Sequence, residues 1–169
     1  MTFPPPSPTT LEDMQLNIIA RVNTCVTHAN NRLAINLAQP TISFDQRGKI
    51  AGCARLQNNT LKFNPVLLVD NYATFMSEVV PHEVCHLLTY TLFGRVRPHG
   101  KEWRSLMSQL FRLTGHTYHK MDVTKVSGKT FPYVCECGQI ELSIRRHNKV
   151  QRQQQRYICR QCSEILQPL

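Results

Sequence analysis

The sequence lacks long apolar runs and has no export signal at its start. No stretch of about 18 uncharged apolar residues occurs, which excludes an ordinary membrane-spanning helix. Residues 1–8 are rich in proline and contain neither a basic segment nor an apolar one, so a secretory leader is not predicted. We therefore expect a soluble, cytoplasmic protein.

Acidic residues are also scarce. Asp and Glu number 11 against 20 Lys and Arg, which gives a formal net charge of +9. Residues 120–169 hold nine basic and four acidic residues, whereas residues 1–119 hold eleven and seven. A basic excess of this kind indicates a polyanionic partner. Nucleic acid is the first expectation and an anionic membrane surface the second; we predict the former and no membrane partner. The oligomeric state is not predicted.

The chain is expected to divide into three parts. Residues 1–9 are too rich in proline to fold alone and are predicted to form a flexible tail. Residues 10–122 have enough apolar residues for one compact domain. Residues 123–169 form a small second domain that needs a stabilising metal.

Residues 10–122 alternate between helical and strand patterns. A capping box at Thr10 and Asp13 opens a helix that runs to about residue 30. Strands are predicted at residues 41–44, 49–56 and 60–63, with a turn at 58–59, as a short antiparallel β-meander. A helix capped by Asn71, bent at Pro81 and ended at Gly94 follows, and then a helix over residues 101–113. These elements predict an α+β fold.

The motif His82-Glu83-Val84-Cys85-His86 places two imidazoles and one carboxylate on a single helical turn. At about 100° per residue, His86 lies about 40° and Glu83 about 100° from His82 around the helix. Both imidazoles can then bind one ion while the carboxylate lies beside them. A Zn²⁺ ion with an open coordination position lowers the pKa of its water to about 7. The motif therefore predicts a zinc hydrolase in which Glu83 is the general base and not a ligand.

A catalytic zinc usually has three protein ligands and one water. One common arrangement is excluded, because Leu92 and Thr89 stand where that arrangement has His and Gly. His99 is favoured as the third ligand, since the turn at Gly94 and Pro98 can fold the chain back onto the motif. The alternatives that remain open are Glu102, His116 and His119. Glu102 could instead orient an imidazole.

Two stretches of the sequence closely resemble the bacterial SprT family, whose eukaryotic relative is the DNA-dependent protease Spartan. They are residues 80–88, Val-Pro-His-Glu-Val-Cys-His-Leu-Leu, and residues 93–103, Phe-Gly-Arg-Val-Arg-Pro-His-Gly-Lys-Glu-Trp. The likeness extends over roughly residues 10–166 and includes residues 130–137, 145–150 and 157–162. It implies that His82, His86 and His99 bind the metal and that Glu83 is catalytic. It also implies a zincin-like metallopeptidase fold followed by a small zinc-binding subdomain.

Four of the seven cysteines form two close pairs near the C-terminus: Cys135, Cys137, Cys159 and Cys162. In a reducing cytosol such pairs predict a metal site ahead of disulfides. The pairs are 21 residues apart and predict a C-terminal β zinc ribbon with one structural Zn²⁺, because so short a segment cannot fold unaided. The hairpin strands are placed at residues 139–145 and 155–158. Only one residue separates Cys135 from Cys137, so His147 is an alternative ligand.

A basic run lies between the two cysteine pairs and consists of Arg145, Arg146, Lys149, Arg152 and Arg156. These cations could bind phosphates, and Tyr133 or Tyr157 could stack on an exposed base. The alternative is a solvated hairpin without a partner. More positive charge is expected near the catalytic loop from Arg95, Arg97, Lys101 and Arg104, which favours nucleic acid.

The function predicted from these motifs is a zinc-dependent endopeptidase with one catalytic and one structural zinc. Its predicted substrates are proteins associated with DNA. An extended substrate is expected to add to the edge of the sheet as another strand. One alternative is a non-catalytic nucleic-acid-binding or regulatory protein in which a fourth ligand, Glu102 or Cys85, closes the first site. Another is a zinc hydrolase of small amides.

Overall fold

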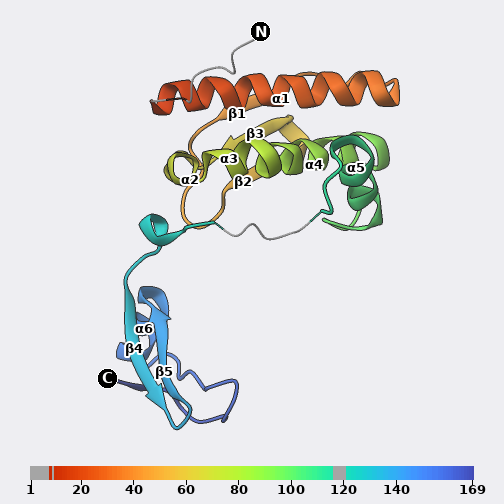
Figure 1. The fold of residues 1–169 in the computed structure, drawn as a ribbon. Coiled ribbons are helices and arrows are strands. Elements are labelled where there is room, and N and C mark those ends of the chain that lie inside the picture. Colours follow the sequence, from red (N-terminus) through yellow and green to blue (C-terminus); the bar gives the residue numbers. More distant parts are fainter. Residues whose placement is uncertain (1–7, 9, 116–120) are drawn as a thin grey trace. The chain divides into compact units, whose positions relative to one another are not determined.

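The structure is a computed structural model that describes residues 8, 10–115 and 121–169. It consists of two compact units, which separate between Val126 and Ser127 (Figure 1). The predicted flexible tail falls almost wholly outside the described residues. Among the described helices, none has the length and apolar character needed to cross a lipid bilayer.

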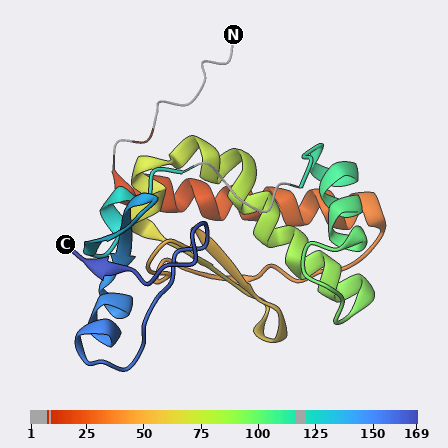
Figure 2. The same cartoon turned by 90° about the horizontal axis from the view of Figure 1, so that it is seen from below.

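The first unit begins with helix α1 (Leu11–Leu33), and the predicted capping box is confirmed. The Thr10 side chain accepts a hydrogen bond from the Asp13 backbone N–H at 3.1 Å, and Asp13 accepts one from the Thr10 N–H at 3.3 Å. The helix ends at Ala34, which has the left-handed φ of 52°. Its apolar face is buried in the core of the unit. This face packs along helix α4, as Figures 1 and 2 show.

A three-stranded sheet follows, formed by β1 (Thr41–Ser43), β2 (Gly52–Arg55) and β3 (Thr60–Phe63). The predicted antiparallel meander is wrong. The strand order is β1-β3-β2, and β1 pairs with β3 in parallel while β2 pairs with β3 antiparallel. The segment between β1 and β2 passes round the end of β3, where Asn64 Nδ2 donates to the carbonyls of Gly48 and Ile50. Strand β2 is consequently an edge strand.

Three helical segments lead from the sheet to the motif. Helix α2 (Pro65–Asp70) was not predicted, although Asn64 caps it by accepting from the N–H groups of Val66 and Leu67. Helix α3 (Tyr72–Thr74), the π-helical turn η2 (Phe75–Val79) and α4 (Val80–Phe93) then follow without a break. The Asn71 side chain does not cap α3, contrary to prediction; it bonds the backbone of Asp122 instead. The predicted end at Gly94 is confirmed.

Helix α5 (Lys101–Phe111) packs against α4, and its buried residues are the predicted ones: Trp103, Leu106, Met107 and Leu110. Towards the end of the unit, the short helix η3 (Thr124–Val126) returns to α2. Lys125 forms a 2.7 Å ion pair with Asp70 there. The last residues of the first unit are thus fixed to α2 by this pair and by the Asn71 hydrogen bonds.

The second unit contains a hairpin of β4 (Thr130–Cys135) and β5 (Gly138–Ser143), helix α6 (Ile144–Gln151) and the short strand β6 (Gln167–Pro168). Its strand order is β5-β4-β6. The predicted pairing of residues 139–145 with residues 155–158 is wrong, because the partner of β5 is β4. In the second predicted strand only Ile158 forms a bridge, to Ile165. The basic run begins on a helix and not in a hairpin turn.

Candidate metal centres

The three imidazoles proposed as ligands converge on one point in the first unit. The Nε2 atoms of His82 and His86 are 3.1 Å apart, and each lies 3.0 Å from Nε2 of His99. His82 and His86 come from the first two turns of α4, and His99 comes from the loop between α4 and α5. The helical spacing of four residues therefore supplies two nitrogens, and the returning loop supplies the third.

A tight turn places His99. The Gly100 N–H donates to the Arg97 carbonyl at 3.0 Å, and Pro98 and His99 occupy the two central positions. His99 has a φ of 55°, the left-handed value that the third position of a type II turn requires. Glycine or asparagine usually fills this position, and another residue there costs about 1–2 kcal/mol. The chain accepts this strain at the residue that completes the cluster.

Trp103 forms the floor beneath the cluster. Its side chain is fully buried, and its ring centroid lies 4.7 Å from that of His82, 5.5 Å from that of His86 and 4.7 Å from that of His99. Such contacts restrict the rotation of all three imidazoles. The expectation that Trp103 belongs to the core is confirmed, and the same packing fixes the direction of the three nitrogens.

The donor set fits a tetrahedral zinc ion. Tetrahedral Zn–N bonds of about 2.0–2.1 Å require nitrogens about 3.3 Å apart, close to the 3.0–3.1 Å between these three Nε2 atoms, so His82, His86 and His99 could hold such an ion. Burial lowers the pKa of His86 to about 4, and the charge of His99 adds to this effect. Burial and then Arg104 lower the pKa of His99. Both rings are therefore neutral near pH 7, which is the form that binds metal.

Glu83 lies beside the cluster in a space created by a glycine. A Cβ atom at Gly52 of strand β2 would lie 2.8 Å from Cγ and 3.0 Å from Oε1 of Glu83. Only Gly therefore leaves room for the carboxylate at this point of the strand. Burial raises the pKa of Glu83 to about 8, against the opposing effect of a hydrogen bond from the Ala54 backbone. A cation at the three imidazoles would favour the ionised form.

Among the described residues, neither Glu102 nor Cys85 joins this cluster as an alternative or additional ligand. The group whose donor atoms could share an ion consists of His82, His86 and His99, without Glu102 or Cys85. The Cys85 thiol donates to the Trp103 carbonyl at 3.4 Å, and burial raises its pKa to about 12. His116 and His119, and Tyr118 beside them, fall outside the described residues.

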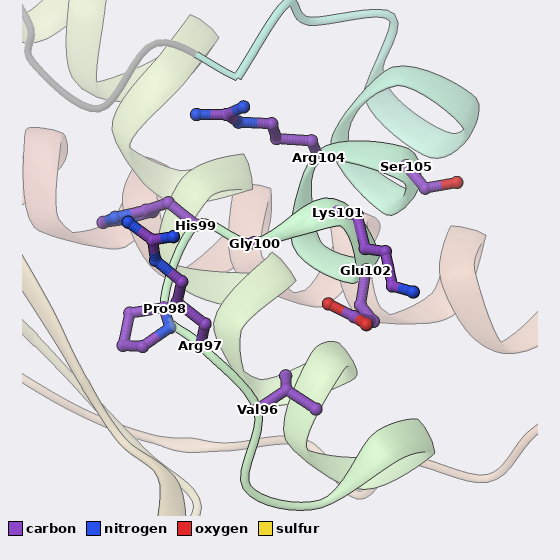
Figure 3. Close-up of a pocket in the computed structure, with 9 residues that line it drawn as sticks. All are labelled: Val96, Arg97, Pro98, His99, Gly100, Lys101, Glu102, Arg104 and Ser105. Carbon is purple, nitrogen blue, oxygen red and sulfur yellow. The ribbon is translucent and has the colours of Figure 1, made fainter.

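A broad pocket of about 1180 Å³ lies beside His99 on the loop between α4 and α5. Figure 3 shows Arg97, His99 and Arg104 on one side of this loop and Lys101 with Glu102 on the other, at the start of α5. The predicted positive charge near the cluster is therefore present. Gly100 makes room for the turn, because a Cβ there would lie 2.9 Å from the Arg97 carbonyl oxygen.

The four paired cysteines come together in the second unit. Their Sγ atoms, one from each of Cys135, Cys137, Cys159 and Cys162, lie within 4.8 Å of one another. Tetrahedral Zn²⁺ with bonds of about 2.3 Å requires thiolates about 3.8 Å apart, so the set fits a ribbon site. The N–H groups of Cys162 and Gln161 lower the pKa of the Cys159 thiol to about 7. The short Cys135–Cys137 spacing does not prevent convergence, because the hairpin turn between β4 and β5 lies there.

His147 is not part of this cysteine cluster. Its ring stacks on Phe131 with centroids 3.7 Å apart, and its Nδ1 lies 3.1 Å from the Tyr133 hydroxyl. The prediction of an accessible Tyr133 is wrong, since this side chain is fully buried and cannot stack on a base. Tyr157 is partly exposed, and the Arg146 guanidinium lies 5.5 Å from its ring centroid.

The predicted nucleic-acid-binding residues lie along α6 and the segment after it. Arg145 and Arg146 are exposed in the first turn of α6, and Lys149 in the last turn bonds Gln155 at 3.2 Å. Arg152 ends the helix, and Arg156 follows in an exposed segment.

Sequence reasoning missed Gly52, although a glycine inside a strand often marks close approach of another group.

Comparison with known proteins matches both units. Residues 22–123 match the SprT-like family, and residues 129–169 match the SprT-like zinc ribbon domain. Protein SprT of Actinobacillus succinogenes is 45% identical over 161 residues, which cover 95% of each chain. Protein SprT of Shewanella oneidensis is 47% identical over 149 residues, covering 88% of this chain and 96% of the other. Protein SprT of Yersinia enterocolitica is 49% identical over 147 residues, covering 85% and 86%. No solved structure matches the chain.

Proposed function

This chain belongs to the SprT-like family, and from that premise we propose that it is a zinc-dependent endopeptidase whose first unit is zincin-like. One observation carries the proposal: three imidazole nitrogens lie about 3.0 Å apart, and the buried Glu83 is on α4, the helix that supplies two of them. His82, His86 and His99 would hold the ion. No fourth ligand closes the cluster within the described part of the chain, so the observation favours a catalytic site over a purely structural one.

Zinc bound there supplies a Lewis acid and a water of lowered pKa. Glu83 accepts the proton of the attacking water and delivers it to the leaving amine. Its burial keeps bulk water from competing for that proton, and the Ala54 backbone fixes the carboxylate by a hydrogen bond. Gly52 leaves the space that the Glu83 carboxylate occupies, because a Cβ there would lie 2.8 Å from Glu83 Cγ.

Polypeptide is the proposed substrate because β2 is an edge strand next to this carboxylate. Its neighbour β3 uses only one side of it, so an extended polypeptide can add on the other side by backbone hydrogen bonds. The Ala54–Glu83 contact brings the added segment beside the reacting groups.

Cytoplasmic location is part of the same proposal, since all seven cysteines are free thiols.

The proposal is tested with Glu83→Gln. We expect this variant to keep the zinc content of the wild type and to lose cleavage of unfolded casein by a factor of about 10³ or more. Glu12→Gln, the same chemical change on the exposed face of α1, is the matched control and keeps both properties. Wild-type casein cleavage by Glu83→Gln would refute the assignment. If the wild-type protein cleaves small amides in preference to casein, the protein is instead a zinc hydrolase of small amides.

The second zinc is proposed at the four cysteines, with a structural role. The unit has a small buried core built around Tyr133, Leu142 and Leu166, so the metal must supply much of its stability. Metal analysis is expected to give two zinc ions per chain. Two zinc ions per chain still present in Cys137→Ser and in Cys162→Ser would contradict the ribbon site.

Nucleic acid is the proposed second partner, through the exposed cations of α6 and the segment that follows it. We expect single-stranded oligonucleotides to bind with strong salt dependence, and Arg145→Ala with Arg152→Ala to lower the slope of log affinity against log salt by about 2. Arg32→Ala, in the last turn of α1, is the control that leaves the slope unchanged. Binding that is insensitive to both α6 substitutions would exclude this surface.

A further inference from the structure

Two cavities lie beside the three imidazoles and share a wall. A cavity of about 70 Å³ is lined by His86, His99 and Trp103 together with Leu56, Tyr90 and Arg95. A pocket of about 370 Å³ lies on the other side of Leu56, Tyr90 and Arg95. The space next to the proposed zinc site is therefore separated only by these three side chains from a larger pocket between strand β2 and the end of α4.

The larger pocket has a mostly polar lining that carries positive charge. Gln57, Asn58 and the half-buried Tyr90 line it with the apolar Ala54 and Leu56, and Arg55 and Arg95 are the only charged lining residues within the described ranges. No carboxylate lines it, and neither arginine forms an ion pair in the part of the chain that the structure describes. Two guanidinium groups without a counter-charge favour an anionic ligand group.

The position of Arg95 follows from the end of α4. Gly94 has a φ of 67°, and its N–H donates to the Tyr90 carbonyl at 2.9 Å, so the chain reverses as the helix ends. The next residue, Arg95, is thereby turned back to line both cavities with Tyr90. Arg55 reaches the same pocket from the end of β2.

We infer that this pocket is a specificity subsite that receives an acidic side chain of the polypeptide substrate, with Arg95 as the main specificity-determining residue. The inference rests on the proposed endopeptidase function. A polypeptide added to β2 presents alternate side chains on one side, and the wall of the pocket is formed by Ala54 and Arg55 of that strand. Two guanidinium groups with the neutral polar groups of Gln57, Asn58 and Tyr90 around them suit the carboxylate of Glu or Asp.

The first experiment compares peptides that differ at one position. Fluorogenic peptides carry Glu, Gln or Lys at successive positions around the scissile bond, and kcat/KM is measured for each. We expect one position at which wild-type enzyme prefers Glu to Lys by about tenfold or more, as one partly exposed charge pair provides. Arg95→Glu is expected to reverse this preference and Arg95→Gln to abolish it. Arg32→Glu, on α1, is the charge-matched control that retains it.

A second readout separates this inference from the proposed function. Glu83→Gln protein loaded with zinc is titrated with the same peptides, and binding is followed by fluorescence anisotropy. If wild-type enzyme cleaves no peptide but this variant binds Glu peptides about tenfold more tightly than Lys peptides, the subsite stands and the catalytic proposal fails. If peptides are cleaved without a charge preference, or Arg95→Glu keeps the wild-type preference, the subsite is refuted.

Nucleic acid is the other polyanion that these arginines could bind. A short oligothymidine is added to the peptide-binding assay as a competitor. We expect it to leave the Arg95-dependent preference for Glu peptides in place. Loss of oligothymidine affinity in Arg95→Glu, with peptide binding unaffected, would assign the pocket to nucleic acid and overturn the inference.

Discussion

Gly52→Ala tests whether the catalytic carboxylate depends on a missing side chain. The added Cβ would lie 2.8 Å from Glu83 Cγ and 3.0 Å from Oε1, whereas carbon atoms in contact are normally about 3.5–4.0 Å apart. Since Gly52 does not have a left-handed φ, alanine fits its backbone. The new methyl group must therefore displace Glu83 or the strand by roughly 0.5–1 Å.

A displacement of this size is expected to lower kcat by about 10²-fold, because misplacing a catalytic group by about 1 Å has effects of that order. Zinc content should not change, since the substituted residue does not contact the three imidazoles. The free energy of unfolding should fall by about 1–2 kcal/mol, because crowding costs about 1–3 kcal/mol and removing a glycine from a strand returns about 0.5–1 kcal/mol.

The assay combines casein cleavage, zinc analysis and thermal unfolding of the same preparations. Gly128→Ala is the matched control, since a Cβ there meets no atom within 4 Å and all three properties should stay at wild-type values. Wild-type kcat in a folded, zinc-loaded Gly52→Ala enzyme would refute the reasoning. Loss of zinc together with activity would show that the substitution disturbs the imidazoles and not the carboxylate.

Three further predictions follow from the metal clusters. His99→Asn should remove the zinc of the first unit, as metal analysis would show. It should also stabilise the metal-free protein by up to about 1 kcal/mol, since Asn tolerates the left-handed φ of 55°. Destabilisation of the metal-free form would contradict this. Cys162→Ser should abolish the second zinc and unfold residues 127–169 while casein cleavage by the first unit persists; proteolysis of that segment with retained activity is the check. In chelated protein, the raised pKa of Glu83 means that its contribution to stability is present below pH 4.5 and is lost as pH rises through about 8. Glu83→Gln should then raise the free energy of unfolding by a few kcal/mol at pH 8 but by less than about 1 kcal/mol at pH 5. Equal effects at both pH values would show that the carboxylate is not desolvated.

The sequence was most informative where the chemistry depends on local spacing. The family resemblance is confirmed by the matches to both units, and the four-residue separation of His82 and His86 suffices to place two imidazoles on one side of a helix. The turn of Pro98 and His99 could also be anticipated, because proline and the following glycine favour it. The roles of these residues as zinc ligands stay a prediction.

Sequence reasoning failed where tertiary contacts decide the structure. Alternation of side chains locates strands but does not say which strands pair, so the parallel β1–β3 pairing depended on Asn64 holding the crossover segment. Helix α6 contains only two apolar residues, Ile144 and Val150, which are too few to distinguish a helix from a loop by apolar spacing. Burial of Tyr133 likewise depends on the hairpin partner of β5, which was assigned to the wrong segment.

Trp103 is the only tryptophan of the chain, and it lies against all three imidazoles. The tryptophan fluorescence of the protein therefore comes entirely from the floor of the candidate zinc site. A protonated imidazole quenches indole emission by electron transfer, and burial lowers the pKa of His86 to about 4, so emission of the metal-free protein is expected to fall as the pH drops through about 4. Zinc competes with protons for the same nitrogens, so metal loading is expected to shift this fall to lower pH. The protein thus carries an intrinsic optical reporter with which zinc affinity can be titrated without a label.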